Sequence, residues 1–139
     1  MSSSLSLVRS ALVKSFVDGA FFPAANIQWE NVPFVPPVGL PWAAVWFMPA
    51  QPVVATLGSG GQDMVDGIFQ VDLNYPLGGG DAEIGAKYDA LKNLYKAGLR
   101  PSYGGQEVIV RACGRSQSQV IDGFCRCSVT VTFYAHINR

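Results

Sequence analysis

Residues 66–96, DGIFQVDLNYPLGGGDAEIGAKYDALKNLYK, decide the fold of this chain. From Phe69 to Tyr75, apolar and polar residues alternate, which is the pattern of a strand with one buried face. Pro76 ends this strand because proline lacks the backbone N–H that a central strand needs, and the glycines at 78–80 let the chain turn back. Apolar residues then recur at helical spacing, at Ile84, Tyr88, Leu91 and Tyr95. The stretch therefore predicts a strand, a glycine turn and a helix.

The rest of the chain predicts one more helix and several more strands around this unit. The helix is expected over residues 4–18, capped by Ser2, Ser3 or Ser4. Strands are expected at 26–31, 42–48, 53–57, 107–114 and 124–137, with 42–48 and 53–57 adjacent. A chain of 139 residues can bury the core of one domain, so residues 1–139 are expected to form a single domain. This order predicts an α+β fold: a mixed, mostly antiparallel sheet of about five to six strands with two helices packed on one face.

Two segments are expected to project from this domain. Residues 31–41 contain four prolines, which exclude a helix or a central strand and favour a stiff, extended arm. Residues 58–61, Gly-Ser-Gly-Gly, form a flexible tip, and glycines 78–80 form a second glycine-rich loop. The arm suits a structural loop or a clasp on another subunit better than a ligand of a signalling domain, because no basic residue flanks it. The candidate contacts with other subunits are Phe34, Val35, Pro36, Pro37, Val38, Leu40, Gly60 and Gly61.

The composition favours a protein whose surface is partly covered by other subunits. Half of the residues are hydrophobic and only 14% are charged, whereas about 25% is usual for a soluble domain. The net charge is zero, but residues 1–89 carry eight acids against three bases and residues 90–139 carry seven bases against two acids. Either this asymmetry is chance, or oppositely charged surfaces of neighbouring copies meet. In the second case the candidate electrostatic contacts are Arg111, Arg115 and Arg126.

No pattern in the sequence predicts catalysis, a cofactor or a metal. The glycine turn resembles a phosphate-binding loop, but Ala86 stands where that loop needs lysine. A hairpin centred near Gln119 would place Cys113 opposite Cys125, close to Cys127. Three sulfurs without a nearby fourth ligand are better explained as small buried hydrophobes than as a metal site. We therefore expect no catalytic, cofactor-binding or metal-binding residues.

At this point the order of elements resembles the phage tail terminator-like family, whose small proteins complete the tail tube of long-tailed bacteriophages. The resemblance spans nearly the whole chain. It is carried by the N-terminal helix, the Trp29-Glu30-Asn31 element, the Pro-rich arm, the Trp42 strand, and residues 67–76 running into the amphipathic helix. A final strand ending in VTVTFY at residues 129–134 completes it. No catalytic residues carry over from such a family.

The resemblance implies a structural virion protein at the junction of tail and neck. It would form a ring, commonly of six copies, on the tail tube protein, end tube growth and offer a surface to the head-side connector, with DNA passing through the lumen. The N-terminus lacks a signal-peptide pattern and no apolar run could span a membrane, so synthesis in the host cytoplasm and no membrane partner are expected. The alternatives are another neck or connector component, a small ligand-binding domain, or an enzyme of unrecognised type.

Overall fold

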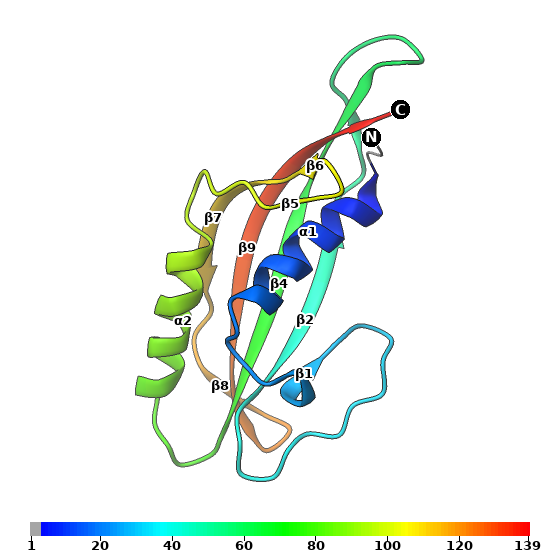
Figure 1. Cartoon of the computed structure of the whole chain (residues 1–139). Helices are drawn as coiled ribbons and strands as arrows, with labels where there is room; N and C mark the ends of the chain where they lie inside the picture. Colours follow the sequence, from blue (N-terminus) through cyan, green and yellow to red (C-terminus); the bar gives the residue numbers. More distant parts are fainter. Residues whose placement is uncertain (1–3) are drawn as a thin grey trace.

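The computed structural model describes residues 4–139, which form a sheet with both helices on one face (Figure 1). The strand order is β1-β2-β4-β9-β7, with β3 beside β4 and β8 beside β9. Only the β1–β2 pair is parallel within this sheet. The helices are α1 (Leu5–Asp18) and α2 (Ala82–Leu94), with a short 3-10 turn at Ala24–Asn26. The strands are β1 (Ile27–Gln28), β2 (Trp42–Pro49), β3 (Val53–Val54), β4 (Gln62–Pro76), β5 (Ser102–Tyr103), β6 (Gln106–Glu107), β7 (Ile109–Arg115), β8 (Gln119–Ile121) and β9 (Phe124–Asn138).

The long pair β4 and β9 forms the centre of the sheet. The two strands pair over their whole 15-residue lengths, from Gln62 opposite Asn138 to Pro76 opposite Phe124. The apolar face expected from Phe69 to Tyr75 is buried, at Phe69, Val71, Leu73 and Tyr75, but the strand is not half-buried as predicted, because Asp72 and Asn74 on the other face are buried as well. Pro76 ends β4, as predicted. The α+β class and the mostly antiparallel sheet are therefore confirmed.

Both helices bury one apolar stripe against this sheet. Ser4 caps α1 by accepting a hydrogen bond from the Leu7 amide at 3.3 Å. The alternative caps, Ser2 and Ser3, lie outside the described residues. The helices meet the core through Val8, Leu12 and Phe16 of α1, and through Ile84, Leu91 and the adjoining Tyr95 of α2. The Tyr95 hydroxyl lies 2.8 Å from Ser15 Oγ, so it links the end of α2 to α1. Burial raises the pKa of Tyr95, which keeps this hydroxyl protonated.

The main sheet has seven strands, where about five to six were predicted, because one short strand forms where a connection was expected. The run expected at 53–57 is only two residues long, and it pairs with β4 instead of lying beside β2. Residues 119–121, predicted as part of a polar connection, form β8. A two-stranded unit, β5 and β6, lies apart from the main sheet.

The predicted pairing of Cys113 with Cys125 is wrong. The final hairpin turns at Asp122 and Gly123, both with positive φ, and not near Gln119. Cys113 consequently pairs with Val131, and Cys125 lies opposite Val120 and Tyr75. All three cysteines are free, and Cys127 is buried in the core. The interpretation of the cysteines as core residues fits Cys127 best, since the other two are half-buried.

Candidate assembly surfaces

The sheet face turned away from α1 and α2 carries a polar cluster around Asp72. Within residues 4–139 no helix covers this face (Figure 1). Asp72 is only 7% exposed, and its carboxylate accepts hydrogen bonds from Trp46 Nε1 at 3.0 Å, Gln70 Nε2 at 2.8 Å and Ser128 Oγ at 2.7 Å. Three donors compensate a buried carboxylate for much of its lost hydration. The cluster therefore holds the central strands in register and leaves no reactive group free.

The three predicted arginines lie apart from one another, and each is bound within its own chain. Arg111 donates to Asp66 at 3.3 Å on the open sheet face. Arg126, on the same face, donates through Nε to Asn74 at 2.7 Å. Arg115 lies near the start of α2, where its guanidinium is 3.4 Å from Asp81. Their contact with acidic residues of a neighbouring copy stays a prediction.

The connection from β7 to β8 is tied to the start of α2 through Asp81. The Ser118 hydroxyl donates to this carboxylate, and Arg115 lies beside it. The Ser118 hydrogen bond, followed by the charge of Arg115, lowers the pKa of Asp81. Asp81 is the N-cap residue of α2, a place for which the sequence offers Gly80 or Asp81, but its side chain bonds to Ser118 and not to the helix amides.

The Pro-rich arm crosses from β1 to β2 without regular secondary structure, as predicted (Figure 1). Its outer residues are exposed, with Val35 at 86% and Val38 at 98% of their surface accessible. Phe34 differs, because its ring packs against Trp42 with centroids 5.1 Å apart. Of the other candidates on the arm, Pro36 and Leu40 are exposed and Pro37 is half-buried. Phe34 thus anchors the arm, and Val35 and Val38 are the apolar groups free to meet another molecule.

Residues 58–61 were predicted as a flexible tip, but the tip, taken here as residues 55–62, is held by Arg139. The Arg139 guanidinium donates to the backbone carbonyls of Thr56, Gly58 and Gln62, and it pairs with Asp63. Cross-strand bonds from the Ala55 and Thr56 amides to Gln62 O, at 2.9 and 3.0 Å, close the hairpin. The tip is therefore a preformed projection at the end of β3 and β4.

Gly61→Ala is expected to open this tip, whereas Gly60→Ala leaves it intact. A Cβ at Gly61 would stand 2.4 Å from Arg139 Nη2 and 2.7 Å from the Thr56 carbonyl oxygen, but a Cβ at Gly60 meets nothing within 4 Å. Displacing the arginine should speed hydrogen exchange of the Ala55 amide about tenfold, equivalent to about 1.4 kcal/mol of local stability. Exchange followed by NMR tests this. Equal rates in the two variants would contradict the role given to Arg139.

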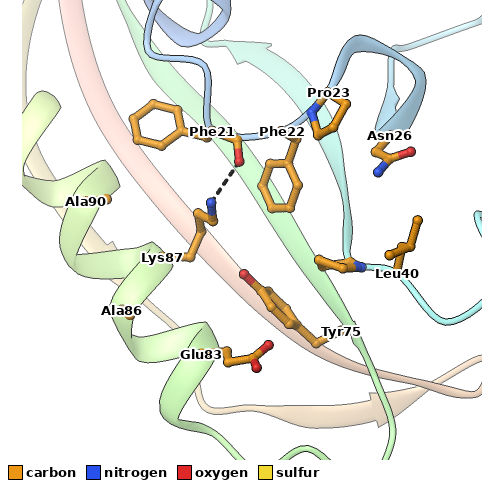
Figure 2. A pocket seen from close by; sticks show the side chains of 11 residues that line it. Phe21, Phe22, Pro23, Asn26, Leu40, Tyr75, Glu83, Ala86, Lys87 and Ala90 are labelled. Carbon is orange, nitrogen blue, oxygen red and sulfur yellow. Dashed lines mark hydrogen bonds between the residues drawn. The ribbon is translucent and has the colours of Figure 1, made fainter.

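An apolar groove lies between α2 and the segment that follows α1 (Figure 2). It has a volume of about 560 Å³. Its walls are mostly apolar, and they include Phe21, Phe22 and Pro23 on one side and Ala86 and Ala90 of α2 on the other. Sequence reasoning missed this groove, because its walls come from segments that are distant in the chain.

Four polar side chains line the same groove, those of Asn26, Tyr75, Glu83 and Lys87. Lys87 donates to the Phe21 carbonyl at 2.7 Å, and its Nζ lies 4.8 Å from the Phe22 ring centroid (Figure 2). Tyr75 is 6% exposed, and its hydroxyl has no hydrogen-bond partner among residues 4–139. Burial, followed by the charge of Glu83, raises the pKa of Tyr75, so the hydroxyl stays a donor at neutral pH.

The described residues do not assemble an obvious catalytic or metal centre. Among residues 4–139, no group of three or more His, Cys, Asp or Glu side chains is placed to hold a metal ion. Burial raises the pKa of the Cys113 and Cys127 thiols, so both are protonated and weakly nucleophilic at neutral pH. Neither helix in this part of the chain is long and apolar enough to cross a membrane.

Comparison with known proteins finds a matching family model and solved structures with a similar fold. The family model described as phage tail terminator protein matches residues 7–133. Ten chains of solved structures match significantly. One of them is 24% identical, with a TM-score of 0.76 over 95% of this chain and 95% of its own. That likeness shows a shared fold. No curated protein matches the chain significantly.

Proposed function

The chain belongs to the phage tail terminator protein family, and on this premise we propose that it forms a ring that caps the tail tube. The ring would stop addition of the tail tube protein, serve as the docking surface for the head-side connector, and let DNA pass through its lumen. The family makes the protein a structural component of the phage tail. Its position at the junction of tail and neck, and a ring of about six copies, are parts of the proposal.

The observation that carries the proposal is the exposure of apolar side chains on two projections. Val35 and Val38 on the arm and Leu57 on the tip are between 86% and 98% exposed. The buried core of a protein interface is more apolar than the rest of the surface, so these exposed side chains are suited to contact with a partner. The zero net charge also suits a lumen through which DNA must slide without being held.

Native mass across protein concentration, combined with a tube-growth assay, tests this function. The expected result is a discrete ring-sized species, or a ring formed on tube ends, and tubes that stop growing when the protein is added. Protein that leaves tube length unchanged and never associates with tube ends would reject the proposal.

The groove supports a second candidate, a small ligand-binding domain, because about 560 Å³ is a typical size for a ligand site. A strictly monomeric protein that binds a small apolar molecule in this groove, and has no effect on tubes, would favour that candidate.

Replacing Val35 and Val38 together with Asp is expected to impair tail completion without unfolding the protein. Their exposed side chains contribute little to the core, so the free energy of unfolding should change by less than about 0.5 kcal/mol. Burying two charges at an interface should weaken capping at least about tenfold. The number of completed tails per added subunit measures this. Val120→Asp on β8, where valine is 70% exposed, is the matched control, and equal activity of both variants would exclude the arm from assembly.

A further inference from the structure

The groove beside α2 and the tip beyond β3 lie at opposite ends of the same long strand. Tyr75, near the end of β4, lines the groove, whereas Gln62, at its start, closes the tip. At about 3.3 Å per residue, the 13 intervening steps place the two features roughly 43 Å apart. A tip therefore cannot enter the groove of its own chain, and only a second copy can bring the two together.

The tip is built to enter an apolar site. Leu57 is 90% exposed, and Val53 and Val54 at the base of the tip are 61% and 60% exposed. Residues 50–62 contain no charged side chain, and the Arg139 guanidinium that holds the tip is paired with Asp63, so insertion brings no unpaired ion to the groove. The bonds from Arg139 fix the tip in one conformation, which lowers the entropy lost on binding.

The polar groups of the groove suit a neutral peptide. Glu83 repels an anionic ligand, and the Lys87 charge is already engaged by the Phe21 carbonyl and the Phe22 ring. What the groove offers a ligand is the Tyr75 hydroxyl, which lines it and has no hydrogen-bond partner in residues 4–139, together with the Asn26 side chain (Figure 2). A glycine-rich tip presents backbone carbonyl oxygens that can accept this bond.

We propose that the groove between α2 and residues 21–23 receives the tip of a second copy, with Leu57 against the apolar walls. The inference rests on the proposed ring and names the contact that builds it. Such a contact joins two different surfaces, so it repeats head to tail and closes into a ring when the rotation between copies allows. The Pro-rich arm is the weaker occupant, because its Leu40 already lines the same groove from within the chain.

Two blocked variants, one altered in the tip and one altered in the groove, test the contact. Leu57→Asp removes the apolar end of the tip, and Ala86→Trp fills the groove from the exposed side of α2. Each alone should weaken assembly at least about tenfold, as loss of a central apolar anchor does. Mixed together, they should form dimers that grow no further, because the intact tip of the Trp variant fits the intact groove of the Asp variant. Val120→Asp and Ala82→Trp, at exposed sites outside the groove and the tip, should assemble like the unaltered protein.

The outcomes separate this inference from the proposed function. If either blocked variant assembles and ends tube growth normally, the contact is wrong and the capping function stands. If the unaltered protein neither assembles nor caps tubes, the proposed function fails. In that case Leu57→Cys and Ala86→Cys chains, with Cys113 and Cys125 replaced by Ser, are mixed at high concentration. With dissolved oxygen as the oxidant, a disulfide that joins a Leu57→Cys chain to an Ala86→Cys chain would support the contact, and its absence would overturn it.

Discussion

Phe69→Ala is expected to lower the free energy of unfolding by about 3–5 kcal/mol, the usual cost of emptying a phenylalanine site in a well-packed core. Phe69 is fully buried in the middle of β4. Its ring centroid lies 6.4 Å from that of Phe16 on α1 and 6.0 Å from that of Tyr95 at the end of α2. The cavity would therefore open at the point where the sheet and both helices meet.

Urea unfolding followed by circular dichroism measures this loss. Tyr103→Ala, at an aromatic that is 45% exposed on β5, is the control and should cost less than about 1 kcal/mol. If the alanine variant does not fold, Phe69→Leu keeps most of the volume and should cost about 1–1.5 kcal/mol. A loss below about 1 kcal/mol for Phe69→Ala would mean that the core does not converge on this ring.

Gly67→Ala is the second change with a large expected effect, about 1–3 kcal/mol or more, because no side chain fits there. A Cβ at this position would lie 2.5 Å from the Met48 carbonyl oxygen and 2.7 Å from Pro49 Cα. Both are backbone atoms of β2, so relief requires the two strands to separate. The neighbouring Phe133 ring, 3.1 Å away, blocks a shift in the other direction.

Gly114→Ala in β7 is the matched control, since a Cβ there meets nothing within 4 Å. Thermal unfolding should show a clear fall in Tm for the first variant and a change of no more than a few degrees for the second. Similar Tm values would contradict the close approach of β2 and β4 at Gly67.

The elements with strong local patterns were predictable from the sequence. Alternation in β4, helical spacing in α2 and the break at Pro76 each depend on neighbours in the chain, so their physical causes are visible in a short window. The same holds for α1 with its Ser4 cap. The fold class followed from the order of these elements.

The predictions that failed concerned features set by the type of turn or by contacts between residues far apart in the chain. The Asp122-Gly123 pair is a recognised hairpin signal, and weighing it would have corrected the cysteine register and revealed β8. The hold of Arg139 on the tip, more than 75 residues away in sequence, leaves no local signature. The groove leaves no local signature in the sequence either, because its walls come together only after folding. The candidates on the arm and tip were placed at the surface by composition, but which of them are free and which are anchored, such as Phe34, required the structure.

The position of β9 has a consequence for how the protein is made. This strand lies between β4 and β7, yet it is the last strand of the sheet to be made, and its partner β4 is already complete at residue 76. At about 5–20 residues per second, the ribosome needs several seconds to add the 62 residues from there to Asn138, and through that time one edge of β4 is unpaired. Such non-local pairing also slows folding after release. The central part of the sheet can therefore close only after β9 has been made, and until then the exposed edge of β4 is open to wrong pairing.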